Sequence, residues 1–436
     1  MKRLKQRALW LNIHLTLALS IGFFFAVMGL TGSLSVYRTA IDEFFNPRLI
    51  IEQPHAQKQP LNKIILAIEN AYPDLTNSWT LEMPLSEQGM ITAWYDKPTE
   101  TFFELYAPLM VSVNPYTAEV VESRYWGKTL TTWVLDLHTQ LKLNKLGWNL
   151  IGFFGVLLCV SIITGLYLWW TDARQFLKKF VVRHDLGLMR LLMDSHRLLG
   201  LIVSPCLLVL AITGINLSFP DLLSDFIGAE GMEHGATGKI IVSTAVPNNH
   251  PTSLDAAEFM ARSVFPKAEL RRISTPVGAT GVYRINFRQK NEINQRHPYS
   301  TVWVDRWSGQ IKEVRNPEKF SAGETLLSAI YPIHSGEALG SFGRFIWFLS
   351  GLALFFLYVS GVLYWLYKRG KVKDRAVNLA DLRPLAKHWA MQTAQAIQAA
   401  IRYATPHCKH AYTKAQPVLK QAEYKLRSFI HDKTRR

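Results

Sequence analysis

The chain has 436 residues, of which 49% are hydrophobic and 19% are charged, and its formal net charge at pH 7 is +16. The hydrophobic residues are concentrated in four long blocks, which excludes an ordinary soluble protein. No nucleic-acid-binding motif accompanies the basic charge, so retention at a membrane and contact with lipid headgroups explain it better than nucleic acid.

Each of the four apolar blocks is long enough to cross a membrane as a helix, which takes roughly 20 residues. They are Ile13–Tyr37, Gly147–Trp170, Leu198–Phe219 and Phe345–Tyr367, and none contains Asp, Glu, Lys or Arg. The first follows a basic N-terminus, as in a signal peptide. It is longer than the apolar core of a signal peptide and lacks a small-residue cleavage site, so we expect an uncleaved first span.

Basic residues near the span ends predict the orientation. The tail from Lys368 onward holds sixteen basic and four acidic residues, whereas the segment from Thr39 to Lys145 holds eight basic and thirteen acidic ones. We therefore expect both termini and the short middle loop to be cytoplasmic and the two long segments to be external. The predicted organisation is a cytoplasmic N-terminus with span 1 (1–38), external domain 1 (39–145), span 2 (146–171), a cytoplasmic loop (172–194), span 3 (195–219), external domain 2 (220–340), span 4 (341–368) and a basic cytoplasmic tail (369–436).

The chain reads as one unit repeated twice, each unit being a helix, an external segment and a second helix. In both external segments, a helical pattern precedes alternating strands and hairpin turns. The first has a helix in PLNKIILAIENAYPD, strands in ITAWY and FFELY and a turn in VNPYTAEVV; the second has a helix in TSLDAAEFMARSVFPKAEL, strands in VYRINF and STVWV and a turn in VDRWSGQIKEV. The predicted fold is a membrane all-α four-helix bundle with two external α+β domains, built by internal duplication with parallel copies.

Four histidines stand at matched places in these units. His14 and His196 are each followed by Thr-Gly at +17 and +18, while His138 and His334 are each followed by glycines at +9, +17 and +27. A single histidine at a helix end is usually an interfacial residue, and duplication alone explains matched offsets. Parallel copies, however, place equivalent residues opposite each other, and two facing imidazoles are suitable axial ligands for a haem iron. The sequence thus predicts a cytoplasmic pair, His14 with His196, and an external pair, His138 with His334.

Four glycines are expected to lie opposite these histidines: Gly32, Gly165, Gly214 and Gly361. Eighteen residues make five helical turns, so Gly32 shares a helix face with His14 and lies level with the external pair. We expect such glycines to give clearance to a flat macrocycle; close helix packing is the alternative. Arg38, Arg197 and Arg344 stand near span ends, where they can pair with haem propionates or extend toward the membrane surface.

The histidine openings, the repeated Thr/Ser-Gly pairs, the GLYLWW ending at Trp170 and the Asp-x-x-Ser-Gly turn at Asp305 resemble the PepSY-associated transmembrane family, over residues from about 8 to 370. The long basic tail is not part of the family pattern. Members of this family are linked to iron acquisition, and some are di-haem reductases that release iron from ferric siderophores outside the bacterial inner membrane. The resemblance implies haem ligation by His14, His138, His196 and His334 and a multi-pass inner-membrane location.

The favoured hypothesis is a transmembrane electron conduit with two haem b groups, since no C-x-x-C-H motif is present for covalent attachment. The acceptor would be a ferric siderophore or another ferric chelate. No G-x-G-x-x-G motif follows a strand, so the donor would be a quinol or a separate cytoplasmic reductase. The alternative is a non-enzymatic membrane protein whose external domains bind a peptide, a protease or an envelope partner. A transporter is less favoured because no span carries an acidic residue, and no H-E-x-x-H or G-x-S-x-G motif indicates a hydrolase.

Overall fold

A computed structural model describes residues 2–55, 57–170, 182–183, 186–227, 240–246 and 249–374. The chain divides into two compact units, one made of Met1–Val182 and Leu191–Lys373 and the other of Arg183–Arg190 and Asp374–Arg436. In the second unit, the Met189 amide donates a hydrogen bond to Asp374 Oδ1 at 3.1 Å. His14, His138, His196, His334 and all described strands lie in the first unit. The middle loop 171–181, His234 and the tail beyond Asp374, with Cys408, lie outside the described residues.

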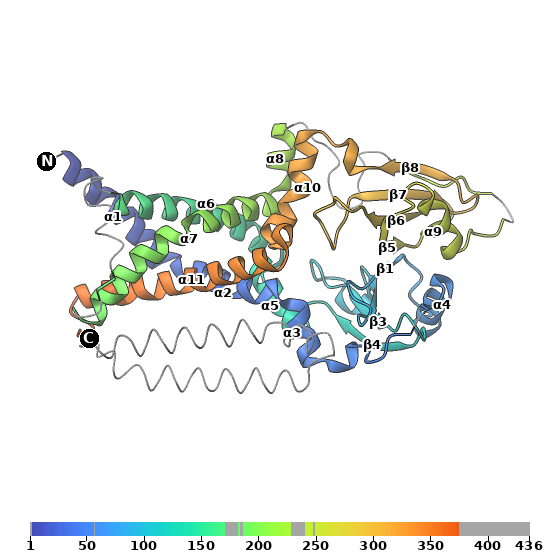
Figure 1. The fold of residues 1–436 in the computed structure, drawn as a ribbon, viewed down its shortest axis with the longest axis horizontal. Coiled ribbons are helices and arrows are strands. Elements are labelled where there is room, and N and C mark those ends of the chain that lie inside the picture. Colours follow the sequence, from blue (N-terminus) through green and yellow to red (C-terminus); the bar gives the residue numbers. More distant parts are fainter. Residues whose placement is uncertain are drawn as a thin grey trace, which may run out of the picture. The chain divides into compact units, whose positions relative to one another are not determined.

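Within the described chain, three helices are each long and apolar enough to cross a membrane (Figure 1). They are α6 (Asn144–Trp169), α7 (Leu188–Ser218) and the stretch Glu337–Lys368, which contains α11 (Gly340–Lys368). A fourth span is obtained when α1 (Lys2–Ser20) and α2 (Gly22–Val36), which are bent relative to each other, are counted together. These bounds agree with the predicted spans to within a few residues, except at the starts of α1 and α7.

The first span is not the single straight helix that the sequence predicts. The chain bends by 63° between α1 and α2, and Ile21 leaves the helical conformation at φ −122° and ψ −5°. The adjacent Ser20 hydroxyl donates to the Thr16 carbonyl oxygen at 2.6 Å, and Ser/Gly pairs with such back-bonding are common sites of helix kinks. The five-turn argument that joined His14 to Gly32 on one continuous helix face therefore does not apply to this span.

Short helices flank the spans on the side of the sheet. Two of them follow a span, namely α3 (Arg38–Phe45) and α8 (Pro220–Ile227). Two precede a span, namely α5 (Leu130–Gln140) and α10 (Ala322–His334). His138 and His334 lie on α5 and α10, so they are separated from the span helices by a sharp turn and are not at the span ends themselves. A capping box between Ser321 and Glu324 fixes the start of α10.

The two external segments form one sheet instead of two separate domains. Eight antiparallel strands run in the order β4-β3-β2-β1-β5-β6-β7-β8 (Figure 1). Their bounds are β1 Trp79–Glu82, β2 Ile91–Tyr95, β3 Leu109–Val113, β4 Val120–Tyr125, β5 Glu269–Ser274, β6 Val282–Arg288, β7 Ser300–Asp305 and β8 Ile311–Arg315. The first half of the chain supplies β1–β4 and the second half supplies β5–β8. The halves join where β1 pairs with β5, through Thr80 with Ser274, Leu81 with Ile273 and Glu82 with Arg272.

Most of the predicted elements in these segments form where the sequence places them. Two helices, α4 (Leu61–Ala71) and α9 (Leu254–Arg262), and the strands β2, β6 and β7 match their patterns. The predicted strand in FFELY is wrong, because residues 102–106 form the connection from β2 to β3. Phe103 is 96% exposed, so this alternating pattern has no apolar layer to pack against.

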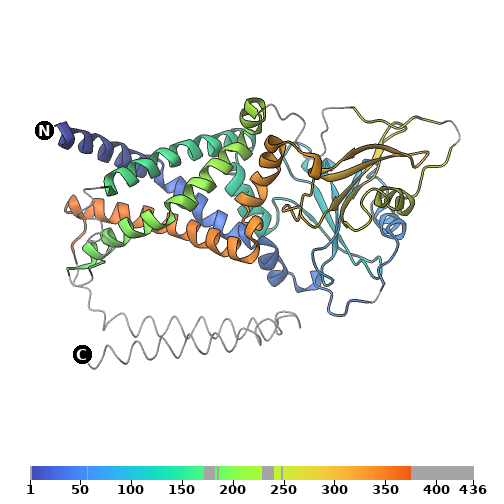
Figure 2. The same ribbon diagram turned by 45° about the horizontal axis from the view of Figure 1, so that its top comes forward.

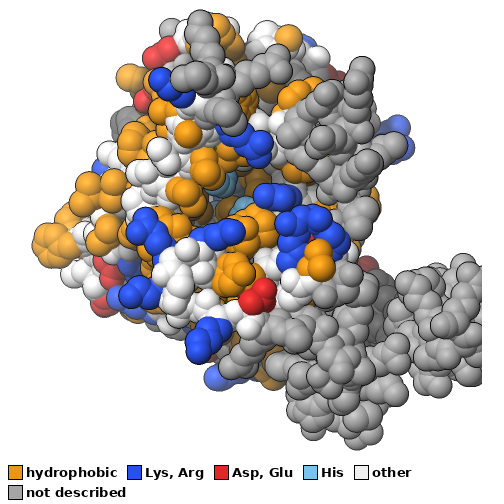
Figure 3. Space-filling model, turned by 90° about the vertical axis from the view of Figure 1, so that its left-hand side faces the viewer, with side chains coloured by type: hydrophobic (Ala, Val, Ile, Leu, Met, Phe, Trp, Pro, Cys, Tyr) orange, Lys and Arg blue, Asp and Glu red, His pale blue; other side chains and the backbone are white. Residues whose placement is uncertain are grey.

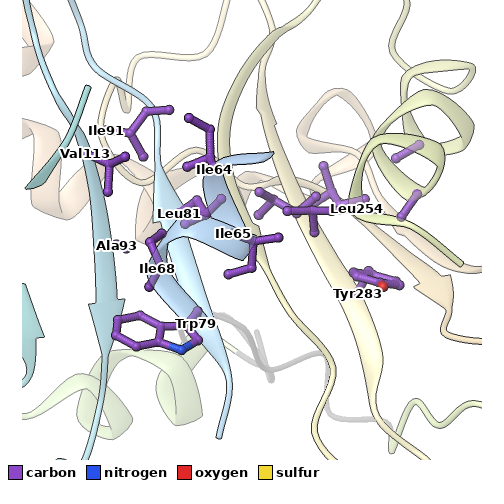
Figure 4. Close-up of a cluster of buried hydrophobic side chains, with 14 of the residues drawn as sticks. Ile64, Ile65, Ile68, Trp79, Leu81, Ile91, Ala93, Val113, Leu254 and Tyr283 are labelled. Atoms are coloured by element: carbon purple, nitrogen blue, oxygen red, sulfur yellow. The ribbon is translucent and has the colours of Figure 1, made fainter. Parts of the chain in front are cut away.

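The apolar face of the sheet is covered by α4 and α9 (Figure 2). Ile64 and Ile68 of α4 and Leu254 of α9 are buried against Leu81 and Ile273 at the junction of the halves (Figure 4). The two helices also cap each other.

The Asp255 carboxylate accepts hydrogen bonds from the amides of Leu61 (2.7 Å) and Asn62 (3.1 Å). Asn62 Oδ1 in turn accepts from the Leu254 amide at 2.8 Å. One half thus satisfies the free helix-start amides of the other, which ties the two halves together.

Replacing Asp255 by Ala should lower the free energy of unfolding of the external sheet by about 1–2 kcal/mol, because two amides at the start of α4 lose their acceptor. The measurement is the thermal unfolding midpoint of the detergent-solubilised protein followed by tryptophan fluorescence. Asp74→Ala removes an exposed carboxylate of the half that contains α4 and serves as the control, with little expected change. Equal midpoints for the two variants would contradict the capping role.

Candidate functional site

Each histidine of the first half lies against a Thr-Gly pair on another helix of the same half. His14 on α1 lies against Thr164 and Gly165 of α6, with Nδ1 3.1 Å from Thr164 Oγ1 and 3.1 Å from the Ser161 carbonyl oxygen. His138 on α5 lies against Thr31 and Gly32 of α2. Its Nδ1 is 3.3 Å from Thr31 Oγ1 and 3.1 Å from the Met28 carbonyl oxygen.

The second half repeats this arrangement. His196 on α7 lies against Ser360 and Gly361 of α11, with Nδ1 2.9 Å from Ser360 Oγ. His334 on α10 lies against Thr213 and Gly214 of α7, with Nδ1 2.9 Å from Thr213 Oγ1. We call each Ser/Thr-Gly pair with its histidine a histidine seat. The four seats are His14 with Thr164-Gly165, His138 with Thr31-Gly32, His196 with Ser360-Gly361 and His334 with Thr213-Gly214.

The hydroxyl in each seat determines which imidazole nitrogen carries the proton. Every one of these hydroxyls already donates to a carbonyl oxygen of its own helix, at distances between 2.6 and 2.8 Å; the pairs are Thr31 with Val27, Thr164 with Ser161, Thr213 with Val209 and Ser360 with Phe356. A hydroxyl has one proton, so its oxygen can only accept from the imidazole. Nδ1 is therefore the N–H donor, and Nε2 keeps its lone pair for a metal ion.

The glycines of the seats give room to the imidazole rings. A Cβ atom built on Gly32 would lie 2.8 Å from His138 Cε1, closer than carbon atoms pack. A Cβ atom built on Gly165 would lie 3.2 Å from His14 Cε1, and one on Gly214 would lie 3.2 Å from His334 Cε1. A Cβ atom on Gly361 would lie 3.4 Å from His196 Cε1. The glycines thus lie opposite the histidines, as expected, but the group that each one contacts is the imidazole. Clearance for a macrocycle is a separate expectation that these contacts do not test.

Equivalent histidines of the two halves face each other. The ring centroids of His138 and His334 are 6.3 Å apart, with 42° between the ring planes, and His14 lies within electrostatic range of His196. Close contact between α2 and α11 joins the halves, since a Cβ on Gly29 would lie 2.6 Å from the Gly351 carbonyl oxygen. Seen from the end of the helices that carries the N-terminus, histidine atoms are visible inside an opening bordered by Lys and Arg side chains (Figure 3).

A buried carboxylate stands next to each external histidine, and sequence reasoning missed both. Asp136 on α5 accepts from Trp126 Nε1 (2.8 Å) and Lys142 Nζ (2.9 Å) and is 3% exposed. Glu337, three residues after His334, pairs with Arg296 Nε at 3.3 Å and is 5% exposed. Cationic side chains lie close to both carboxylates, and such partners offset the loss of water on burial.

The arginines proposed as propionate partners occupy different surroundings. Arg344 lies 4.0 Å from Glu337, so a protein carboxylate already interacts with it. Arg197 is exposed next to His196, and Arg38 stacks over the Trp126 ring at 5.5 Å. The sequence analysis used the Thr/Ser-Gly pairs as a repeat and a family motif but did not predict that their hydroxyls contact the histidines. Their signal is present there, because a Thr or Ser precedes each of Gly32, Gly165, Gly214 and Gly361.

The remaining candidate ligands do not gather into another site. Among the described residues, no group of three or more His, Cys, Asp or Glu side chains is placed to hold a metal ion. His250 is exposed, and His297 packs against the Tyr331 ring at 5.2 Å. Cys159 and Cys206 are free thiols within α6 and α7.

These features define a membrane protein with several candidate spans, an antiparallel sheet and histidines held against Thr/Ser-Gly pairs of neighbouring helices. The family described as PepSY-associated TM region matches residues 11–368, and the chain belongs to this family. No curated protein matches the chain.

The seat geometry predicts that all four imidazoles carry their proton on Nδ1. ¹⁵N NMR of the histidine-labelled protein in detergent should show Nδ1 as the protonated nitrogen in His14, His138, His196 and His334, assigned with single histidine variants. Exposed His250 is the control and should show the Nε2–H form or exchange between forms. An Nε2–H signal from the seat histidines would contradict the assignment.

Proposed function

We propose that the four spans form one helix bundle that holds two haem b groups, one between His14 and His196 and one between His138 and His334. The observation that carries this proposal is the histidine seat, which directs Nδ1 to a protein acceptor and leaves Nε2 free in all four cases. The 6.3 Å separation of the His138 and His334 rings supports it. An iron bound to one nitrogen of each ring would hold the ring centres about 6 Å apart, because each iron–nitrogen bond is about 2 Å.

We infer that the halves arose by duplication of one helix–sheet–helix unit. The four seats, two in each half with the same donor and acceptor atoms, support this, as does the matching order of elements around them. The basic residues near the span ends support an inner-membrane protein with cytoplasmic termini. His14 and His196 would then form the cytoplasmic site, and His138 and His334 the external site.

We further propose that the protein carries electrons outward and reduces a ferric siderophore or another ferric chelate. A haem accepts and releases single electrons at its iron, which is the chemistry this function needs. The protein residues hold the imidazoles in one orientation and exclude water from them through the surrounding apolar helices. The donor would be a quinol or a separate cytoplasmic reductase. Ferric reduction favours iron release because oxygen-rich chelators bind ferric iron more tightly than ferrous iron.

The histidine pairs predict how haem is lost from variants. The purified wild type should contain about two haems per chain with low-spin b-type bands, and His14→Ala and His196→Ala should each reduce the content to about one. The double variant should lose little more, because both residues serve one site. His138→Ala and His334→Ala should together remove the other haem and spare the first.

His250→Ala is the matched control and should keep both haems, since His250 is exposed on a loop. Haem content and reduced-minus-oxidised spectra are the measurements. A colourless wild-type protein, expressed with ample haem supply, would favour the non-enzymatic alternative, in which the external sheet binds a peptide, protease or envelope partner. Loss of one common haem in His14→Ala and His138→Ala would contradict the proposed pairs.

The glycine distances predict a graded effect of added methyl groups. Gly32→Ala should displace the His138 ring and shift the spectrum or potential of the external haem, because its Cβ would lie 2.8 Å from that ring. Gly361→Ala should be tolerated, since 3.4 Å is an ordinary contact distance. Redox titration of each variant followed in the visible bands makes the comparison. Equal effects of the two substitutions would show that the glycines do not act through the imidazoles.

A further inference from the structure

The sheet has a second face, opposite α4 and α9, and this face is polar. Successive side chains of a strand point to opposite faces of the sheet. Leu81 and Ile273 face α4 and α9, so the residues before and after each of them face the opposite side. Two neighbouring cross-strand rows make up what we call the polar face. One row is Arg124, Met110, Trp94, Thr80, Ser274, Arg284, Trp303 and Glu313; the other is Glu122, Ser112, Thr92, Glu82, Arg272, Asn286, Thr301 and Arg315.

Polar contacts hold the two halves together at the centre of this face. Thr80 Oγ1 and Ser274 Oγ are 2.8 Å apart across the β1–β5 junction. Beside them, Arg272 Nη2 donates to Glu82 Oε2 at 2.6 Å, and Trp94 Nε1 donates to the same oxygen at 3.1 Å. The charge of Arg272 is therefore neutralised by Glu82, and the hydrogen bonds of this pair hold both side chains in place.

Arg284 lies on β6, next to β5, and no described carboxylate neutralises its charge as Glu82 neutralises that of Arg272. Among the described residues it forms no ion pair; its guanidinium donates to Ser274 Oγ at 3.3 Å, and its buried Nε has no hydrogen-bond partner. Burial and the nearby charge of Arg272 lower the pKa of Arg284, while Asp96 attracts it only from beyond ion-pair distance. Arg315, stacked on Trp303 at 5.7 Å, adds another positive charge within electrostatic range. A half-buried guanidinium without an ion-pair partner is stabilised by an anion that binds it.

Side-chain contacts connect the polar face with α5, the helix that carries His138. Trp94 contacts Trp126 with ring centroids 5.8 Å apart, and Trp126 bonds to Asp136, two residues before His138 on α5. Arg124, in the first row, forms a bidentate pair with Asp42 of α3, both distances being 2.9 Å.

We propose that the polar face binds the ferric substrate as an anionic chelate, with Arg284 as its main contact and Arg272 and Arg315 beside it. This inference rests on the proposed function and names the class of its substrate. The planar guanidinium fits chelates that present carboxylate oxygens at their surface. A haem held by His138 and His334 would supply one electron and one ferric chelate would become ferrous, so the step would balance with no proton or further reactant. A neutral chelate gains nothing from this charge.

The test uses the full-length, haem-loaded protein in detergent and two probes, ferric citrate as the anion and a neutral ferric trihydroxamate. Equilibrium dialysis of the oxidised protein measures binding without electron transfer. Anaerobic mixing of the reduced, desalted protein with each probe then measures haem reoxidation. Arg284→Gln should weaken ferric citrate binding about tenfold, the loss expected for one hydrogen-bonded charge, and should leave the trihydroxamate unaffected. Arg284→Lys should restore part of the binding.

Arg262→Gln is the matched control, because Arg262 lies on α9 at the opposite face and pairs with Glu258. Unchanged haem spectra verify that each variant is folded. Equal citrate binding in wild type and Arg284→Gln overturns this inference, and so does an equal loss for both probes. If ferric citrate binds through Arg284 but neither probe reoxidises the haem, the anion site stands and the reductase function fails. If both probes are reduced equally by wild type and Arg284→Gln, the reductase function stands without this site.

Discussion

The hydrogen bond from imidazole Nδ1 to a buried Ser or Thr hydroxyl is the constraint on which the arrangement of the helices depends. A polar ring largely surrounded by apolar side chains needs a hydrogen-bond partner. The hydroxyl cannot donate to the ring because its proton is already bonded within its own helix, as at Thr213 with Val209. This fixes the proton on Nδ1, and the neighbouring glycine lets the ring approach closely enough for the bond to form. Histidine, hydroxyl and glycine therefore act as one unit.

Some of the repeated glycines are explained by this packing, and their spacing in the sequence already indicated where they lie. The glycine at +27 in each half, Gly165 or Gly361, belongs to a histidine seat. The one at +9 has another cause: a Cβ on Gly147 would collide with the Gln140 carbonyl oxygen, and one on Gly343 would meet that of Gly336. Spacing therefore predicted which glycines lie opposite histidines. It did not predict the imidazole as the contacting group, because the ring's direction depends on a hydroxyl from a different helix.

The features that the sequence did not predict depend on contacts between distant segments. The sequence analysis placed the segments that contain β1 and β5 in separate domains, because periodicity describes the faces of a strand and not its edges. Their pairing joins residues about 190 positions apart, such as Leu81 with Ile273. The bend at Ile21 likewise lies in a continuous apolar run, where length and composition give no sign of a break. Buried Asp136 and Glu337 escaped notice because acidic residues in an external segment are ordinary.

The joined sheet gives the external histidines a physical relation that neither half has alone. His138 and His334 come from different halves, so their 6.3 Å separation depends on how the halves are held together. Contacts at two levels hold them: Gly29 against Gly351 within the helices, and Thr80 with Ser274 in the sheet. Arg296 adds a third link, since it donates to Thr39 of the first half and pairs with Glu337 of the second. A shift at the sheet junction would therefore move both the arginines of the polar face and the histidine pair, which couples the proposed anion site to the His138–His334 pair.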